Sequence, residues 1–284
     1  MNVEKTPITA NFGAMIACSD PLSCCDKKSA SQLKQLLYEN KFLLFKNQEL
    51  SNEQYIQFAK QLGEPIIFSH PSYRHPDHPE IFVSSNMYRQ GKKIGVDRVG
   101  LNWHSDCCFL PNPLPLTMLY CKYAPEQGGE TEFTDMHYVY KQLPKKIKES
   151  IDKKLVSFRA EKQYIITAQD VGMYLKELID KINRDYAPAK HQSVFKHRFT
   201  GKKILYINNG FSENIIGLKP KKSQRLLNEI FRITEQAKAR YKHQWNVGDV
   251  LIWDNRSVIH RAYPASSGQQ RMMYRIGIKD DVFF

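Results

Sequence analysis

The stretch Thr-Met-Leu-Tyr-Cys-Lys-Tyr at residues 117–123 decides the fold class of this chain. It is rich in residues that favour β-strands, and similar short runs lie at 80–84 and 131–133. Proline, asparagine and a Gly-Gly pair separate these runs from one another. The middle of the chain is therefore predicted to begin a β-sheet core.

Apolar periodicity predicts further strands and several helices around this core. The other strands are predicted at 42–45, 203–208, 250–253 and 271–279, and the helices at 28–38, 51–63, 144–151, 170–183 and 223–237. Ser51 and Gln54 form a capping box for the second helix, and Ser223 is the expected cap of the last one. The helix at 170–183 is predicted to have an apolar face made of Val171, Leu175, Leu178, Ile179 and Ile182. The insert that contains it could cover the mouth of a barrel.

The chain of 284 residues shows no internal repeat, low-complexity tract or linker rich in proline and glycine. Its 42% hydrophobic residues supply enough apolar surface for one large core. We therefore predict a single domain over residues 1–284. Its class is α+β, mainly β, with a β-barrel or double-stranded β-helix core, flanking helices and a helical insert at about 139–190.

The chain is basic, with 42 Lys and Arg against 29 Asp and Glu. The basic residues occur in short scattered groups, which are typical of a solvated surface, and no nucleic-acid-binding module accompanies them. Six cysteines without a C-x-x-C pair favour reduced thiols. There is no N-terminal signal pattern and no apolar run of about 18 residues. We expect a cytoplasmic protein that binds neither nucleic acid nor membrane, and a homo-oligomer is left open.

In Asn-Trp-His-Ser-Asp, residues 102–106, His104 and Asp106 lie two positions apart. Alternate side chains of an extended segment point to one face, so both can reach the same ion. By itself the pattern is weak, because a lone histidine is more often structural than a metal ligand. A distant histidine would complete the two-His-one-carboxylate triad that binds non-haem iron(II) and leaves positions open for other ligands.

His260 is the best candidate for that distant histidine. It ends the stretch GDVLIWDNRSVIH, in which a predicted strand follows a Gly-Asp turn. Arg271 and Arg275 follow on another predicted strand and share a face, because they are four positions apart. A guanidinium binds a carboxylate through two parallel hydrogen bonds, so either arginine could hold the far end of a dicarboxylate, with help from the Thr131 hydroxyl. Alone, the arginines would be read as surface ion pairs.

Several motifs together resemble the taurine dioxygenase (TauD/TfdA) family of iron(II)- and 2-oxoglutarate-dependent oxygenases, over about residues 33–278. They are Trp-His-Ser-Asp at 103–106, Gly-Gly-Glu-Thr at 128–131, Trp-Asp-Asn-Arg at 253–256, His260 and the two trailing arginines. Several motifs in one order are far more specific than any one of them.

This resemblance implies a double-stranded β-helix (jelly roll) core with iron(II) bound by the three candidate ligands, and with 2-oxoglutarate and O2 as cosubstrates. It also implies that Thr131 and an arginine hold 2-oxoglutarate. In the wider family that arginine stands where Arg271 lies, which leaves Arg275 for an anionic substrate. A closer subgroup uses the position of Arg275.

The subgroup contains isonitrile-forming oxygenases, which the chain resembles at 75–85, 170–184 and 203–207. Those enzymes oxidise an N-carboxymethyl β-amino acid group and favour a Lys-X-Arg pair and three tyrosines as carboxylate contacts. This chain keeps only the last tyrosine, and its residues at the five positions are Ile165, Thr167, Phe68, Ser69 and Tyr73. The pocket is therefore expected to have its own substrate preference.

His70 resembles the substrate-contacting histidine of taurine dioxygenase, which makes His70 and Tyr73 the candidates for substrate binding. Ordinary structural roles are the alternative for both. The resulting hypothesis is a dioxygenase, with His104, Asp106 and His260 as catalytic metal ligands, that hydroxylates or desaturates a small anionic or amino-acid-derived substrate and releases succinate and CO2. The alternatives are an isonitrile-forming oxidative decarboxylase acting on an N-carboxymethyl amino acid, and a non-catalytic metal-binding scaffold.

Overall fold

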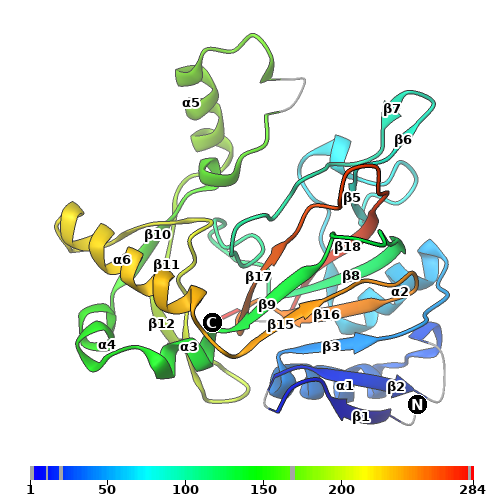
Figure 1. Cartoon of the computed structure of the whole chain (residues 1–284), viewed down its shortest axis with the longest axis horizontal. Helices are drawn as coiled ribbons and strands as arrows, with labels where there is room; N and C mark the ends of the chain where they lie inside the picture. Colours follow the sequence, from blue (N-terminus) through cyan, green and yellow to red (C-terminus); the bar gives the residue numbers. More distant parts are fainter. Residues whose placement is uncertain (1–2, 11, 19–21, 167–169, 281–282) are drawn as a thin grey trace.

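The computed structural model describes residues 3–10, 12–18, 22–166, 170–280 and 283–284, and most of its regular elements are strands (Figure 1). The first part of the chain forms β1 (Val3–Pro7), β2 (Ala14–Cys18), η1 (Leu22–Cys24), α1 (Lys27–Asn40), β3 (Phe42–Phe45), α2 (Asn52–Leu62), β4 (Glu64–Pro65), η2 (Pro71–Tyr73), β5 (Phe82–Ser85), β6 (Tyr88–Arg89), β7 (Lys92–Lys93), β8 (Leu116–Tyr123) and β9 (Thr131–Asp135). The last part forms β15 (Arg240–His243), β16 (Val250–Asp254), β17 (Val258–Ala262) and β18 (Met272–Lys279).

Two sheets make up the core. The larger has the strand order β1-β2-β3-β16-β8-β18-β4, with β5 also pairing with β18. Its pairs are antiparallel except for β2 and β3, which are parallel. The smaller sheet has the order β15-β9-β17 and is antiparallel. The mainly β architecture predicted from the sequence is confirmed.

Strand β3 shows how the two sheets are held together. Its side chains alternate, so Leu43 and Phe45 join the apolar residues of α1 and α2, whereas Phe42 and Leu44 belong to the cluster between the sheets. There the ring centroids of Phe42 and Phe133, on β9, lie 5.3 Å apart. Because both faces of β3 are buried, its sequence is apolar at every position.

The capping box predicted for α2 is confirmed. The backbone N–H of Gln54 donates to Ser51 Oγ over 3.2 Å, and Gln54 Oε1 accepts from the Ser51 N–H over 2.8 Å. The cap predicted for the last helix is wrong. This helix, α6 (Pro220–Glu235), begins before Ser223, and Ser223 Oγ instead accepts from the backbone N–H of Ile215 in β14 (Ser212–Ile215).

Residues 136–239, between β9 and β15, form what we call the β9–β15 insertion, which lies to the left in Figure 1. It contains α3 (Met136–Gln142), α4 (Lys145–Ile151), β10 (Leu155–Phe158), η3 (Ala160–Gln163), α5 (Leu175–Asp185), β11 (Ala189–Gln192), β12 (Val194–Lys196), β13 (Lys203–Leu205), β14 (Ser212–Ile215) and α6. The predicted helical insert at about 139–190 therefore includes strands as well as helices. These strands form the orders β11-β10-β14 and β12-β13.

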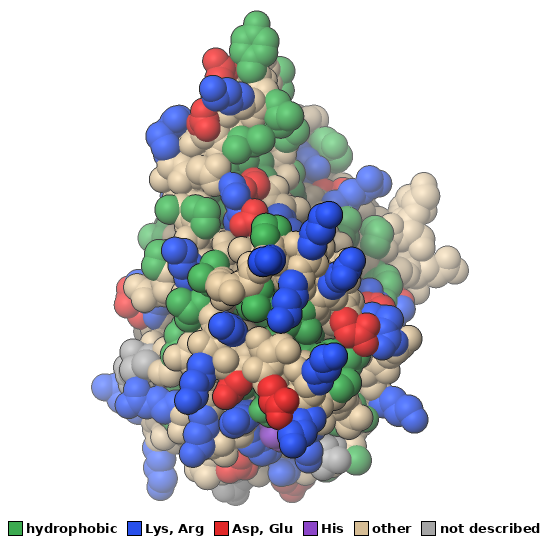
Figure 2. Space-filling view, turned by 90° about the vertical axis from the view of Figure 1, so that its left-hand side faces the viewer, with side chains coloured by type: hydrophobic (Ala, Val, Ile, Leu, Met, Phe, Trp, Pro, Cys, Tyr) green, Lys and Arg blue, Asp and Glu red, His purple; other side chains and the backbone are tan. Residues whose placement is uncertain are grey.

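The apolar face predicted for 170–183 is wrong in part. Helix α5 begins only at Leu175, and just two of its residues, Leu178 and Ile182, are buried. Val171 and Leu175 are 77% and 73% exposed. Hydrophobic side chains accordingly lie open to solvent at the top of Figure 2, where α5 is found.

The positive charge of the chain is concentrated in the β9–β15 insertion, which contains 22 Lys and Arg against 10 Asp and Glu. Many of these side chains lie on the face shown in Figure 2. Such a surface raises the local concentration of anions around it. In the described part of the chain, no helix is long and apolar enough to cross a membrane.

Candidate metal and cosubstrate site

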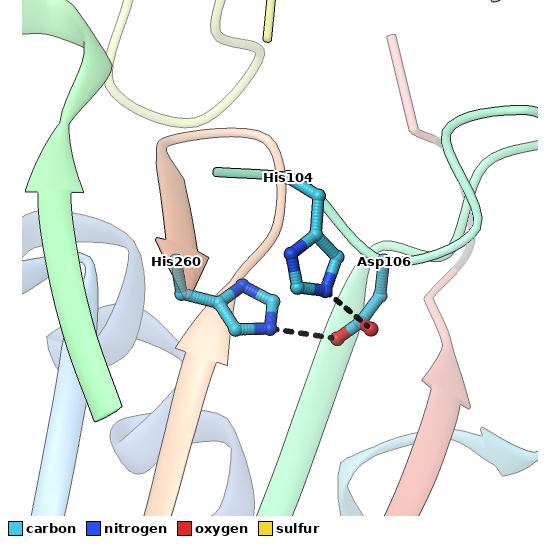
Figure 3. Close-up of side chains that lie close together, drawn as sticks. All are labelled: His104, Asp106 and His260. Carbon is cyan, nitrogen blue, oxygen red and sulfur yellow. Dashed lines mark ion pairs between the residues drawn. The ribbon is translucent and has the colours of Figure 1, made fainter. Parts of the chain in front are cut away.

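The structure brings His104, Asp106 and His260 together (Figure 3). His104 and Asp106 lie in the loop before β8, and His260 lies in β17. The backbones of His104 and His260 form a two-residue antiparallel bridge, with N–H to O distances of 3.0 and 2.8 Å. Hydrogen bonds therefore hold this loop against β17. They bring together two histidines that are far apart in the sequence.

The three side chains are buried, and their ligand atoms lie within 4.8 Å of one another. His104 Nε2 is 3.8 Å from Asp106 Oδ1, and His260 Nε2 is 3.7 Å from Asp106 Oδ2. Two imidazole nitrogens and a carboxylate converging from one side form the donor set typical of non-haem iron(II) sites. The residues present therefore fit this metal.

The orientation of the His104 ring is set by the chain itself. His104 Nδ1 lies 2.8 Å from the carbonyl oxygen of Asn102, which can only accept a hydrogen bond. Nδ1 must then carry the hydrogen, so the lone pair of Nε2 points toward Asp106. This is the tautomer that a metal ligand requires.

Asp106 is held by neighbours from three other segments. Its carboxylate accepts from Thr117 Oγ1 over 2.7 Å and from Arg275 Nη1 over 2.8 Å, and its backbone N–H donates to Asn255 Oδ1 over 3.2 Å. Asn255 Nδ2 also donates to Thr117 Oγ1. The sequence analysis missed the supporting roles of Thr117 and Asn255, although Asn255 lies within the quoted motif at 253–256.

The electrostatics keep all three side chains in the state that binds metal. Burial alone raises the pKa of Asp106, but Arg275, followed by the two histidines, outweighs it and lowers the pKa to about 2. Burial lowers the pKa of His104, and burial together with the nearby His104 lowers the pKa of His260 to about 3. At neutral pH the site therefore consists of two neutral imidazoles and a carboxylate.

Two cavities meet at this site. The larger, of about 290 Å³, and the smaller, of about 70 Å³, are both lined by His104, Asp106 and Arg275, and the smaller also by His260. A small molecule in either cavity would lie beside the three converging side chains. Such a pair of adjoining cavities can hold a cosubstrate and a substrate at the same time.

Thr131 and Arg271 lie together in the smaller cavity. Arg271 Nε donates to the carbonyl of Gly129 over 3.0 Å, and this side chain forms no ion pair with any described carboxylate. Burial lowers the pKa of Arg271 to about 10. Thr131 Oγ1 accepts from Trp245 Nε1 over 3.0 Å, so its own hydrogen is available to donate elsewhere. Both groups can bind an anionic ligand.

His70 and Tyr73 line the larger cavity, with their rings stacked at a centroid distance of 4.4 Å. His70 Nδ1 is hydrogen-bonded to Ser72 Oγ at 2.7 Å, which leaves Nε2 for other contacts. Phe68 and Ile165 line the same cavity. Ser69 does not line it but is hydrogen-bonded to the hydroxyl of Tyr186, which does, and Thr167 lies outside the described residues.

The sequence matches the family described as "Taurine catabolism dioxygenase TauD, TfdA family" over residues 4–276. The chain belongs to this family. The resemblance inferred from the motifs is thus confirmed, and so is the predicted enzyme class, a 2-oxoglutarate-dependent dioxygenase and hence an oxidoreductase.

Named relatives of this TauD/TfdA protein span almost its whole length. It is 27% identical to the alpha-ketoglutarate-dependent 2,4-dichlorophenoxyacetate dioxygenase of Cupriavidus pinatubonensis, over 99% of each chain. It is 28% identical to pentalenolactone F synthase of Streptomyces arenae, over 98% of this chain and 96% of the relative. Among solved structures, a taurine dioxygenase from Burkholderia xenovorans is similar with a TM-score of 0.78 at 25% identity, covering 98% of this chain and 90% of that one.

The buried histidines of this TauD/TfdA protein predict an acid-sensitive metal-free form. The pKa of His260 is lowered from 6.5 to about 3, so between these pH values the unfolded chain binds more protons than the folded one. Stability therefore falls as the pH falls through this window, by about 2 to 4 kcal/mol between pH 7 and pH 4 for His260 alone. Denaturant unfolding with a chelator present measures this. His260→Ala should lose less stability over the same pH range. An equal loss would contradict the assignment of this pH dependence to His260.

Gly100 is a second feature that the sequence analysis missed. It has φ +70°, and a Cβ there would lie 2.7 Å from His104 Cε1. We expect Gly100→Ala to displace the His104 ring and weaken metal binding about 10- to 100-fold, the range found when the support of a ligand is lost. Calorimetric titration with iron(II) without oxygen measures this.

Gly91 offers a matched control for that change. It also has a positive φ, of +74°, but no atom of the described residues lies within 4 Å of the position that its Cβ would take. Both substitutions carry the same backbone strain, and only Gly100→Ala crowds a candidate ligand. Equal losses of metal affinity in the two variants would show that strain, and not the contact with His104, is responsible.

Proposed function

We propose that the chain binds iron(II) through His104, Asp106 and His260 and uses 2-oxoglutarate and O2 to oxidise a small organic anion. The observation that carries this proposal is the convergence of the three buried side chains where the two cavities meet. Bound iron and 2-oxoglutarate would supply the oxidising chemistry, with release of succinate and CO2. The outcome for the substrate is hydroxylation or desaturation.

Arg271 and Thr131 are the proposed anchors for the far carboxylate of 2-oxoglutarate. Arg271 is preferred to Arg275 because the latter is already paired with Asp106, at 2.8 Å, whereas Arg271 has no described acidic partner. A buried guanidinium without a counter-ion is costly, and an incoming carboxylate would supply one. Gly129 leaves room for this side chain, since a Cβ there would lie 3.0 Å from Arg271 Cδ.

Arg275, His70 and Tyr73 are the proposed substrate contacts in the larger cavity. Arg275 supplies the positive charge beside the metal site, and His70 has a ring nitrogen free to hydrogen-bond. Together they favour an anionic substrate. The basic β9–β15 insertion would also attract anions toward the protein.

An N-carboxymethyl amino acid is less favoured as the substrate. Phe68 and Ile165 give the larger cavity apolar surface at positions where the isonitrile-forming subgroup has a tyrosine and a lysine. A carboxylate placed against such surface would lose hydration without gaining a partner. The main proposal therefore remains hydroxylation or desaturation.

The remaining features of the proposal follow the family. We interpret the two facing sheets as a double-stranded β-helix within one domain of residues 1–284. A cytoplasmic location and a free small-molecule substrate, without nucleic acid or membrane as partners, complete the proposed assignment.

Succinate release tests the proposed function. The purified protein would be given iron(II), 2-oxoglutarate and O2 with small amino acids, N-carboxymethyl amino acids, sulfonates, carnitine-like molecules or aryloxyacetates. We expect at least one organic anion to raise succinate release above the rate without substrate. If iron(II) binds but 2-oxoglutarate is never consumed, the non-catalytic scaffold becomes the better explanation.

A further inference from the structure

A contact between Trp103 and Arg261 lies behind the two proposed histidine ligands. Trp103 precedes His104 in the chain and Arg261 follows His260, and neither of them lines the two cavities at the metal site. The guanidinium carbon of Arg261 lies 4.5 Å from the centroid of the buried Trp103 ring. A cation over the face of an indole is an attractive contact. The two histidines are therefore joined twice, through their own backbones and through the side chains of their neighbours.

Glu235, the last residue of α6, binds both members of this pair. Its Oε2 accepts from Trp103 Nε1 over 2.6 Å, and its Oε1 accepts from Arg261 Nη2 over 3.2 Å. Hydrogen bonds to a carboxylate are charge-assisted and stronger than those between neutral groups. The end of the β9–β15 insertion is thereby tied to the loop that carries His104.

Two further side chains complete this group. Glu132, on β9, accepts from Arg261 Nε over 3.0 Å, and Arg240, on β15, has its guanidinium carbon 5.2 Å from the centroid of the Trp103 ring. Arg240 Nη1 also lies 3.7 Å from Glu132 and 3.6 Å from Glu235. We call the five residues the Trp103 clamp: Trp103, Arg261, Glu235, Glu132 and Arg240. Two positive and two negative charges are balanced around one indole ring.

The ion pairs of the Trp103 clamp contribute little stability by themselves. The side chains of Glu235 and Arg261 are 50% and 23% exposed, so water screens their attraction. The position of the clamp matters more. Neighbouring side chains of a strand point to opposite faces, so the direction of Arg261 in β17 also sets the direction of His260. A shift of Arg261 would turn this part of β17 and move the histidine with it.

We propose that the Trp103 clamp positions the two histidine ligands, because it holds the loop before β8 and strand β17 at the separation that a metal ion requires. This inference rests on the proposed function, since it concerns the same metal site. Trp103 and Arg261 act through the backbones of His104 and His260, so they are positioning residues and not ligands. Through Glu235 the clamp connects α6 to the metal site, although no residue of α6 lines either cavity.

Glu235→Ala tests the clamp, because it removes the group that binds Trp103 and Arg261 together. Anaerobic calorimetric titration measures the affinity for iron(II), and the visible absorption of the protein saturated with cobalt(II) reports the geometry of the bound metal. We expect the iron(II) affinity to fall about three- to tenfold, less than when a group in direct contact with a ligand is lost, and the cobalt(II) bands to shift. Glu235→Gln keeps an acceptor for Trp103 Nε1 and should recover part of the affinity.

Glu229→Ala is the matched control on the same helix. Glu229 pairs with Arg232 of α6 at 2.7 Å and does not belong to the clamp. The change removes the same charge, so it should leave the iron(II) affinity and the cobalt(II) spectrum unchanged. Trp103→Phe is a second variant, which keeps an aromatic ring and removes the indole donor. It should resemble Glu235→Ala.

The outcomes separate the clamp from the metal site itself. Unchanged affinity and spectrum in both Glu235→Ala and Trp103→Phe would overturn the positioning role, even if both variants unfold more easily in denaturant, because a contact that only supports the fold leaves the geometry of the bound metal as it was. Equal changes in Glu229→Ala would also overturn it, since they would follow from net charge. Iron(II) binding to the unchanged protein is measured first. Its absence would overturn the proposed metal site together with this inference, whereas binding that is the same in all variants overturns the clamp alone.

Discussion

Replacing His260 by alanine is expected to lower iron(II) affinity by at least about 100-fold and to abolish 2-oxoglutarate turnover. His260 supplies one of the three converging ligand atoms, and its Nε2 lies 3.7 Å from the Asp106 carboxylate. Removing a ligand itself should cost more than the 10- to 100-fold typical of losing a group that supports one. Anaerobic calorimetric titration with iron(II) and succinate release with O2 measure the two effects.

The fold should survive this change. The backbone of His260 keeps both hydrogen bonds to His104, and alanine can occupy β17. His78 is the matched control, because its ring pairs with Glu53 at the surface and lines neither cavity. His78→Ala should keep both iron binding and turnover. Full turnover in His260→Ala, with circular dichroism unchanged, would rule out the proposed ligand set.

The sequence was most informative where a pattern is local. His104 and Asp106 lie two positions apart in an extended segment, so their shared direction follows from backbone geometry. The capping box of Ser51 and Gln54 is likewise settled within one turn of helix. The choice of His260 as the third ligand depended on the order of the motifs. Sequence spacing alone does not say which strand lies beside the loop that carries His104.

Long-range contacts account for what the sequence did not reveal. Periodicity predicted an apolar face around α5, but it could not show that only Leu178 and Ile182 of this helix would be buried. Ser223 has the right chemistry for a cap, yet the strand that arrives beside it, β14, offers its Oγ a different donor. The support of Asp106 by Thr117 and Asn255 exists only because β8 and β16 are paired.

The same limit applies to the cavity. Gly100 gave no signal in the sequence, since a glycine in a turn is ordinary. Its close approach to the His104 ring appears only in the folded chain. The chemistry of the proposed centre could thus be predicted, whereas the surfaces that would select a substrate required the folded chain.

Replacing Arg271 by alanine is expected to weaken 2-oxoglutarate binding by about 10- to 100-fold, since hydrogen bonds to a charged group contribute about 1.5 to 3 kcal/mol. Iron(II) affinity should be unchanged, because Arg271 touches Gly129 and Asn86 and none of the proposed ligands. Arg271→Lys should recover only part of the loss, because lysine keeps the charge but not the planar pair of donors. Titration of 2-oxoglutarate into the iron-loaded protein without O2 measures each effect.

Arg275→Ala is the informative comparison, because Arg275 shares the smaller cavity but contacts Asp106. If Arg271 holds 2-oxoglutarate, Arg275→Ala should chiefly weaken substrate binding and alter iron(II) affinity through the loss of its 2.8 Å contact with the carboxylate. A larger loss of 2-oxoglutarate affinity in Arg275→Ala than in Arg271→Ala would reverse the two assignments. The anion-binding role in the larger cavity would then need another residue, and the half-buried His70, with one ring nitrogen uncommitted, is a candidate.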